Sequence, residues 1–377
     1  MSKVIVGLSG GVDSSVSALL LLRAGYDVEA MYMRNWDSAV NNDLRGNPDR
    51  DDPVCPQEAD YADALAVAER LGIRLHRHDF IQEYWDDVFT RFLAEYRRGR
   101  TPNPDVLCNK YIKFKTFHTI ASGLGADFIA MGHYARIVHS DAEAVLLRGV
   151  DPNKDQTYFL CQLDQDQLQD VLFPVGGLPK AEVRELARAA GLPTADKKDS
   201  TGICFIGERR FSQFLSNYLP AQPGDILNDE GVRLGRHEGL MNYTIGQRKG
   251  LMIGGSQQYG NDPWFVVGKR LDANALIVGQ GFNHPLLLAD ACFLEEFNWI
   301  PRRPMPTELA CTAKFRYRQA DVPVTVETGT GKEPVVRFHA PVRAVTPGQS
   351  CVLYDGDVCL GGGTIAQVFF GGIRREY

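Results

Sequence analysis

A short apolar strand that runs directly into a glycine loop and then a helix constrains the fold of this chain more than any other feature. Residues 4–8 (VIVGL) are the predicted strand and residues 9–15 (SGGVDSS) the loop. Residues 14–24 (SSVSALLLLRA) are apolar enough for a buried helix, and Gly25 is placed to end it. Glycines let a backbone approach phosphate closely, and the first turn of a helix presents free N–H groups. The segment therefore predicts a phosphate-binding loop.

The ending of this loop narrows the chemistry. It lacks the Gly-Lys-Ser/Thr of a Walker A motif, so it supplies no lysine for the β- and γ-phosphates. Ser9, Ser14 and Ser15 can add hydroxyl donors, and Asp13 can help to hold a magnesium ion. The loop resembles the PP-loop of the ATP pyrophosphatases, which holds pyrophosphate while AMP passes to the substrate. A glycine turn without any ligand is the alternative interpretation.

The first two hundred residues alternate between β-rich runs and helical patterns. Besides the first strand and helix, the pattern predicts strands over residues 28–33, 73–80 and 128–131 and helices over residues 59–71 and 180–190. We interpret the last helix as a packing helix rather than half of a DNA-reading helix-turn-helix. Such alternation is typical of an α/β fold with a parallel sheet, which binds ligands beyond the carboxyl ends of its strands.

Two regions depart from this alternation. Residues 36–56 are acidic and rich in Asn, Gly and Pro, which predicts a mobile surface loop. Residues 301–377 form β-like runs separated by turn signals, which predicts a small β-barrel. Because 377 residues are too many for one ordinary core, two or three domains are expected. We divide the chain into a nucleotide-binding domain (1–208), a central linker domain (209–284) and the barrel (285–377).

Composition leaves the partner open. A net charge of −6 argues weakly against nucleic acid, although a modular protein can gather its basic residues on one face. The sequence shows no signal peptide and no run of 18 apolar residues, so we expect a cytoplasmic protein without a membrane partner. Eight cysteines without framework spacing or a C-x-x-C pair predict reduced thiols and no structural metal site.

Two cysteines stand in polar, chemically distinctive contexts. Cys108 precedes a predicted helix, whose N-terminus, with the nearby Lys110 and Lys113, favours the thiolate. Asp105 opposes the thiolate electrostatically, unless its role is to move a proton. Cys204 lies in a segment bracketed by glycines. For either residue, a small buried hydrophobe is an equal alternative. We interpret five of the other cysteines as core or structural residues: Cys161, Cys292, Cys311, Cys351 and Cys359. Cys55, in the acidic loop, is ambiguous.

Six motifs stand in the order found in the bacterial tRNA-specific 2-thiouridylases, members of the PP-loop superfamily, and the chain resembles that family over essentially its whole length. The two cysteine motifs are specific to that family within the superfamily. The motifs are SGGVDSS (9–15), TPNPDVLCNKYIKF (101–114), MGHYAR (131–136), KDQTYFL (154–160), DSTGICFIG (199–207) and GQRKGL (246–251).

The resemblance implies a reaction and its participants. The C2 oxygen of the wobble uridine, U34, is adenylated with release of pyrophosphate, and a cysteine persulfide then delivers sulfur as AMP leaves. It implies ATP with Mg²⁺, the anticodon stem-loop of tRNA, and a sulfur-relay protein or cysteine desulfurase as persulfide donor. Cys204 corresponds to the persulfide-bearing cysteine and Asp105 to the acid/base aspartate. Cys108 corresponds to the partner that releases the sulfur or forms a transient disulfide.

The same correspondence implies the binding residues. The central domain and the barrel correspond to tRNA-contacting units, and residues 36–56 are longer than this family leads us to expect. The residues that match ATP contacts are Gly7, Leu8, Ser9, Gly10, Gly11, Val12, Asp13, Ser14, Met33 and Gly132. The residues that match tRNA contacts are Asn103, Pro104 and Asp105 near the target base, and His133, Lys154, Asp155, Gln156, Arg316, Tyr317 and Gln349.

The stretch 311–318 (CTAKFRYR) bears on RNA independently of the resemblance. Its residues alternate with period two, which predicts a strand with Lys314, Arg316 and Arg318 on one face. Three cations in a row can follow phosphates, although a solvated strand face is as good an interpretation. A second basic cluster, Arg97, Arg98 and Arg100, has the same two interpretations.

Three other functions share parts of this pattern. An adenylating ligase or amidotransferase for a small molecule would use the same loop, and a lysidine-type tRNA ligase would use ATP with lysine as nucleophile. Both would survive replacement of Cys108 and Cys204 by serine. A nucleotide-sensing RNA-binding protein would show no turnover, so release of AMP and pyrophosphate that depends on tRNA and a sulfur donor would exclude it.

Overall fold

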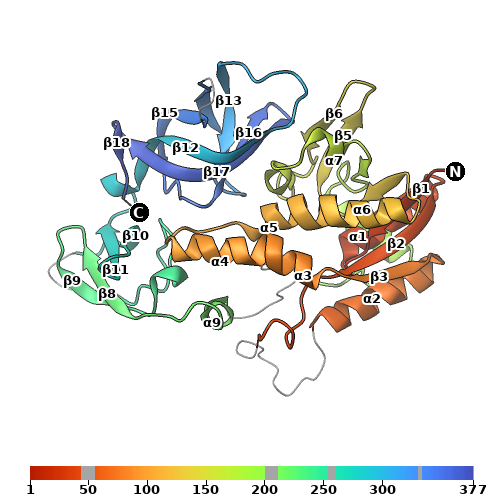
Figure 1. Cartoon of the computed structure of the whole chain (residues 1–377), viewed down its shortest axis with the longest axis horizontal. Coiled ribbons are helices and arrows are strands. Elements are labelled where there is room, and N and C mark those ends of the chain that lie inside the picture. The colour runs from red at the N-terminus through yellow and green to blue at the C-terminus, as the bar shows by residue number, and fades with distance from the viewer. Residues whose placement is uncertain (44–55, 200–210, 254–259, 330–332, 377) are drawn as a thin grey trace.

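The computed structural model describes residues 1–43, 56–199, 211–253, 260–329 and 333–376. Figure 1 shows three units, an α/β domain, a small β-rich central domain and a C-terminal barrel, which confirms the predicted fold class. Cys204 and Cys55 lie outside the described residues. None of the described helices is both long and apolar enough to span a membrane.

The N-terminal domain is built on a parallel sheet of five strands. The order is β3 (Leu75–Asp79), β2 (Asp27–Arg34), β1 (Lys3–Gly7), β4 (Phe128–Ala130) and β7 (Val171–Leu172). The side chains of β1 are buried on both faces, because Val4 and Val6 enter one core and Ile5 the opposite one. Helices on both sides provide those cores, as expected for a parallel sheet.

The helices of this domain form two groups. Helix α1 (Val12–Arg23) follows the glycine loop and packs with α2 (Pro56–Leu71) and α8 (Lys180–Ala189). Two long composite helices cross the middle of Figure 1 toward the central domain. They comprise α3 (Ile81–Tyr84), a π-helical turn (Trp85–Phe89) and α4 (Thr90–Arg97), and then α5 (Pro104–Leu107), a π-helical stretch (Cys108–Thr116) and α6 (Phe117–Gly123). Short helical segments also occur at Thr157–Leu160, α7 (Gln165–Leu168), Leu240–Asn242 and Pro285–Leu287.

The predicted mobile loop begins as a packed segment, so this expectation is wrong for residues 36–43. The Trp36 side chain is 1% exposed and packs edge-on against Tyr84 and Phe89. Its indole N–H donates to Asp43, and Tyr218, which follows α9 (Phe211–Ser216), donates to the Asn41 carbonyl. Trp36 therefore anchors a stretch that its polar neighbours predict to be mobile, although Val40 within it remains exposed.

The central domain is a four-stranded sheet. Its order is β10 (Trp264–Arg270), β11 (Ala275–Gln280), β8 (Gly224–Asn228) and β9 (Arg233–His237), with β11 and β8 parallel and the other pairs antiparallel. Its own apolar core is formed by side chains such as Ile226, Val266 and Val278. The domain therefore has the core of an independent unit.

The barrel is closed, because its first and last strands also pair with each other. The strands run in the order β12 (Leu288–Trp299), β15 (Val335–Arg343), β14 (Val322–Glu327), β13 (Glu308–Lys314), β16 (Ser350–Asp355) and β17 (Val358–Phe370), and β17 pairs back onto β12. The short β18 (Ile373–Arg374) pairs with β17. A hairpin of the N-terminal domain, β5 (Ala135–His139) and β6 (Ala144–Arg148), extends the same sheet through the pair Leu147 and Val358.

Candidate active site

The glycine loop connects the carboxyl end of β1 to α1. Gly10 has a φ of +74°, and a side chain there would overlap the Asp60 carbonyl, so only glycine fits. No side chain caps α1, whose N-cap residue is Gly11. The N–H groups of the first turn are consequently left for a ligand, which is the arrangement that binds phosphate.

The loop serines have a different role from the one their hydroxyls suggest. The Ser14 and Ser15 hydroxyls both donate to the Gly11 carbonyl, at 3.0 and 2.8 Å. The Ser9 N–H donates to Ser14 Oγ at 3.2 Å, and the Thr194 hydroxyl donates to Ser15 Oγ at 2.9 Å. Two of the three predicted hydroxyl donors therefore hold the shape of the loop.

The remaining residues of the predicted ATP site shape the loop by close packing. A side chain at Gly132 would lie 2.8 Å from the Ser14 nitrogen, and one at Gly7 would lie 2.6 Å from the Met131 sulfur. Leu8 and Val12 are buried in the cores beside the sheet, and Met33 is buried near the end of β2. The structure thus brings the predicted residues together around the end of β1.

A lysine from a distant helix reaches Asp13. Lys180 Nζ, at the start of α8, lies 2.7 and 2.8 Å from the two Asp13 carboxylate oxygens, and the Tyr134 hydroxyl donates to Asp13 at 2.7 Å. The lysine also lies 2.8 Å from Asp199. In this structure Asp13 therefore forms an ion pair with an ammonium group, whereas we had expected it to help hold a magnesium ion. No group of three or more potential ligands is placed to hold a metal among the described residues.

Asp199 gathers three cations at the beginning of the DSTGICFIG motif. Besides Lys180, Lys154 lies 2.7 Å and Arg184 2.7 Å from its carboxylate. Hydrogen bonds and charge from Lys154 and Lys180 outweigh the desolvation of this carboxylate and hold the pKa of Asp199 well below its usual value. The sequence prediction missed Lys180 and Asp199 as site residues, because nothing local signals that they meet Asp13.

The Cys108 segment is a capped helix start. The Asn103 side chain accepts from the Asp105 N–H at 3.2 Å, and Pro104 occupies the first turn. Cys108 is 1% exposed and lies one turn inside the helix, where the π-helical stretch begins, rather than at its N-terminus as expected. Lys110 is directed away to Gln162 Oε1 at 2.9 Å.

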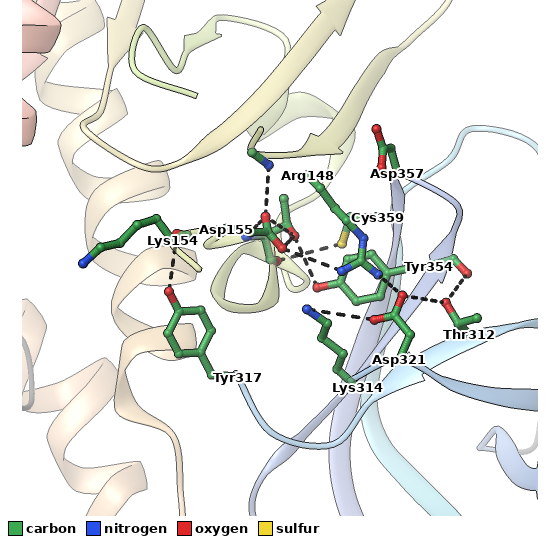
Figure 2. A network of polar contacts seen from close by, with 12 residues as sticks. Arg148, Lys154, Asp155, Thr312, Lys314, Tyr317, Asp321, Tyr354, Asp357 and Cys359 are labelled. Atoms are coloured by element: carbon green, nitrogen blue, oxygen red, sulfur yellow. Dashed lines mark hydrogen bonds and ion pairs between the residues drawn. The ribbon is translucent and has the colours of Figure 1, made fainter. Parts of the chain in front are cut away.

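The KDQ segment stabilises the junction of the N-terminal domain with the barrel. The Asp155 carboxylate accepts from the Gly149 N–H and the Thr157 hydroxyl. Figure 2 shows it close to Arg148 and Tyr354. Gln156 accepts from the Tyr134 N–H at 2.9 Å. Lys154 and Tyr317 meet, since the Tyr317 hydroxyl donates to the Lys154 carbonyl at 3.4 Å (Figure 2).

Of the other predicted tRNA contacts, Arg316 and Gln349 lie at domain junctions, whereas His133 lies within the N-terminal domain. The Arg316 guanidinium donates to the carbonyls of Ile245 and Ala344, at 2.7 and 3.1 Å, which joins the barrel to the central domain. Gln349 donates to the Thr101 carbonyl at 2.7 Å, close to the segment of Asn103. His133 is 8% exposed and packs against aromatic rings.

The predicted row of cations on one strand is not formed. Strand β13 ends at Lys314, and the Gln319 side chain accepts from the Phe315 N–H at 3.0 Å. The Gln319 N–H in turn donates to the Arg316 carbonyl at 3.1 Å. Because of this turn, Arg316 and Arg318 lie beyond the end of β13, and the alternating residues after Lys314 do not form a strand. In the second basic cluster, Arg98 and Arg100 pair with Glu95.

Burial of His133 gives the stability of the protein a specific pH dependence. Desolvation, with the charge of Lys113, holds the pKa of His133 well below 6.5, and its Nδ1 atom is buried without a partner among the described residues. The unfolded chain therefore binds a proton at this histidine below pH 6.5 while the folded protein does not. Stability is lost as the pH falls, by about 1.4 kcal/mol per pH unit below pH 6.5.

Urea unfolding at pH 7.5 and 5.5 checks this expectation. His133→Gln should reduce the pH dependence of the unfolding free energy, because glutamine does not titrate. The exposed His139→Gln is the matched control and should retain the wild-type dependence. Equal pH dependence in the wild type and His133→Gln would contradict the assignment.

Three family models together cover most of the chain. The tRNA methyl transferase HUP domain matches residues 2–208, the tRNA methyl transferase PRC-barrel domain matches 212–280, and the aminomethyltransferase beta-barrel domain matches 289–365. With the fold above, these matches define the class: a nucleotide-binding HUP domain joined to a PRC-barrel and a closed β-barrel.

Curated relatives identify the family. The tRNA-specific 2-thiouridylase MnmA of Acholeplasma laidlawii is 57% identical, over 100% of this chain and 99% of its own length. The protein of the same name from Exiguobacterium sibiricum is 55% identical, over 99% and 96% of the two chains. The chain belongs to this family of tRNA sulfurtransferase enzymes, which confirms the resemblance. A solved 4-thiouridine synthetase–RNA complex with bound ATP is 18% identical over 55% of this chain and 46% of that chain, with a TM-score of 0.34.

Proposed function

We propose that this enzyme uses ATP to convert the wobble uridine, U34, of tRNA into 2-thiouridine. The observation that carries the proposal is the glycine loop at the carboxyl end of β1, with uncapped N–H groups, in a chain that belongs to the 2-thiouridylase family. ATP is a substrate: the loop from Gly7 to Ser14, with Met33 and Gly132, binds its phosphates and adenosine, and Mg²⁺ accompanies the phosphates.

The two chemical steps follow from the poor leaving ability of a uracil C2 oxygen. Attack of this oxygen on the α-phosphate of ATP forms an O–P bond and releases pyrophosphate, so that oxygen can leave as part of AMP. The terminal sulfur of a Cys204 persulfide then bonds to C2 as the C–O bond breaks. Persulfides and thiolates are strong nucleophiles at neutral pH, which suits them to this step.

Cys108 completes sulfur release. Its thiolate attacks Cys204 Sγ, which breaks the S–S bond to the transferred sulfur and leaves a Cys108–Cys204 disulfide. Asp105, one turn before Cys108 on the same helix, accepts and returns the proton that these steps move. An external thiol reduces the disulfide, and a sulfur-relay protein or cysteine desulfurase reloads Cys204.

The domains divide the work in this proposal. Residues 1–208 bind ATP and perform the chemistry, and residues 209–284 and 285–377 bind the anticodon stem-loop. Unstacked bases of an anticodon loop can enter a pocket, whereas paired bases cannot. The predicted contacts Asn103, Arg316 and Gln349 lie near the junctions of these units, which supports a tRNA path along them.

Mass spectrometry of nucleosides tests the proposal. Unmodified tRNA incubated with the protein, Mg-ATP and a persulfide source should yield 2-thiouridine, and tRNA with cytidine at position 34 should yield none. Omission of ATP, or Cys108→Ser or Cys204→Ser, should prevent product formation. ATP cleavage without any thionucleoside would overturn the thiolation proposal and indicate a small-molecule adenylation substrate.

A further inference from the structure

Three parts of the chain meet at Thr101, two residues before the Asn103 helix cap. The Thr101 N–H donates to the Pro347 carbonyl at 3.0 Å, and Gln349 donates to the Thr101 carbonyl at 2.7 Å. The Thr101 hydroxyl donates to the Thr244 hydroxyl of the central domain at 3.3 Å. The segment before Cys108 is thus held between the barrel and a turn of the central domain.

That turn, residues 244–250, has a fixed conformation. The Gln247 side chain accepts from the Thr244 N–H at 3.0 Å and donates to the Lys249 carbonyl at 2.9 Å, which ties both arms together. Gly246 and Gly250 both have a φ of +82°, which favours glycine. The Gly246 N–H donates to the Val266 carbonyl of β10 at 2.8 Å, so the turn is anchored to the central sheet.

The anchored turn presents two cations to solvent. Arg248 and Lys249 are both exposed at its tip, and neither forms an ion pair within the part of the chain that the structure describes. Because the turn is already ordered, a ligand that binds these side chains pays no entropy to order their backbone. They are therefore placed as a preformed pair of cationic contacts.

Two more guanidinium groups lie behind the turn. A side-chain carbon at Gly246 would be 3.4 Å from Arg343 Nη1 and 3.9 Å from Arg316 Nη2. Desolvation and the charge of Arg316 lower the pKa of Arg343, and no carboxylate contributes an opposing effect. Neither arginine forms an ion pair among the described residues. Four cations therefore surround one turn, and their positive potential favours an extended polyanion.

We propose that the turn 244–250 is a tRNA-backbone contact in which Arg248 and Lys249 bind phosphates of the strand that passes the Asn103 helix start. This inference rests on the proposed function and names a part of its tRNA site. The turn that carries these two cations contacts Thr101 through Thr244 and Arg316 through the Ile245 carbonyl, so it adjoins the predicted tRNA contacts. Arg316 and Arg343 form hydrogen bonds at the domain junction, and their charges add to the positive electrostatic potential at the turn.

Salt-dependent tRNA binding by the full-length double variant Arg248→Gln/Lys249→Gln tests this contact. Loss of two phosphate contacts should lower the slope of log K against log salt by about 2 and weaken binding roughly tenfold or more at 0.1 M salt. ATP affinity measured without tRNA should stay at the wild-type value, because the loop of Gly10 is in another domain. Melting temperature, read alongside, should be unchanged since both side chains are exposed.

The matched control removes two cations from the same domain at another edge. Arg233 and Arg236 lie on β9, at the opposite end of the four-stranded sheet from β10, and Arg233 pairs with Asp225 at 2.9 Å. Arg233→Gln/Arg236→Gln should bind tRNA with the wild-type slope. An unchanged slope in Arg248→Gln/Lys249→Gln, or an equal loss of slope in both double variants, would overturn the contact of the turn with tRNA. The proposed function would still stand in that case, provided that the wild-type protein thiolates tRNA. A wild type that neither binds nor thiolates tRNA overturns both.

Discussion

Replacing Cys204 by alanine is expected to abolish thiolation of tRNA while ATP binding and tRNA binding persist. The proposed persulfide has no other attachment point, so the rate of 2-thiouridine formation should fall on the order of 10⁴-fold or more, as when an enzyme loses its nucleophile. Pyrophosphate release that depends on tRNA should continue, because adenylation precedes sulfur transfer. Single-turnover assays that follow 2-thiouridine and pyrophosphate separately measure both effects.

A cysteine of the barrel provides the control for this experiment. Cys311 is half-buried on β13, and burial raises the pKa of its thiol to about 12, so it remains a neutral thiol at physiological pH. Cys311→Ala should thiolate tRNA at the wild-type rate. Full activity of Cys204→Ala would exclude the persulfide route, and loss of pyrophosphate release as well would show that the substitution disturbs the nucleotide site.

Replacing Lys180 by methionine is expected to weaken ATP binding by about two orders of magnitude. Without the ammonium group, the Asp13 carboxylate keeps the Tyr134 hydroxyl as its one partner among the described residues and presents a negative charge beside the phosphate loop. Asp199 retains Lys154 and Arg184. A repulsion of about 3 kcal/mol follows from two unit charges roughly 5 Å apart at an effective dielectric constant of about 20. Isothermal titration with a non-hydrolysable ATP analogue measures the loss.

Two further variants separate charge from packing. Lys180→Arg preserves the positive charge and should recover most of the affinity for the analogue, whereas a purely structural role would not distinguish arginine from methionine. Arg188→Met is the matched control on the same helix, because Arg188 pairs with Asp196 in an exposed position far from Asp13. Wild-type affinity in Lys180→Met would show that Asp13 does not influence the phosphates.

Local patterns in the sequence predict the frame of the site. The strand, the glycine loop and the helix are contiguous, so residues 4–24 suffice to predict the phosphate loop. The helix of the Cys108 motif is predicted too, but its start is misplaced, because Asn103 and Pro104 begin it before Cys108 rather than after it. The family resemblance, carried by six motifs, extends this frame to the whole chain.

Contacts between distant segments are the part that the sequence does not predict. Lys180 is 167 residues from Asp13, and only the packing of α8 on α1 brings the two together. Trp36 is buried because separate segments supply aromatic rings around it. The alternation through Arg318 fails as a strand because a glutamine four residues beyond Phe315 closes a turn. In each case tertiary partners override a local pattern.

The hairpin of β5 and β6 joins the N-terminal domain to the barrel by strand pairing. Side chains of the two domains also pack in one common core. Tyr354 and Val352 of the barrel are buried with residues of the N-terminal domain, and the Arg148 guanidinium stacks 3.6 Å from the centre of the Tyr354 ring. The two units are therefore continuous in both their sheet and their core. Movement of the barrel relative to the N-terminal domain would break the pairing of β6 with β17 and open this shared core, so we expect the two units to move together.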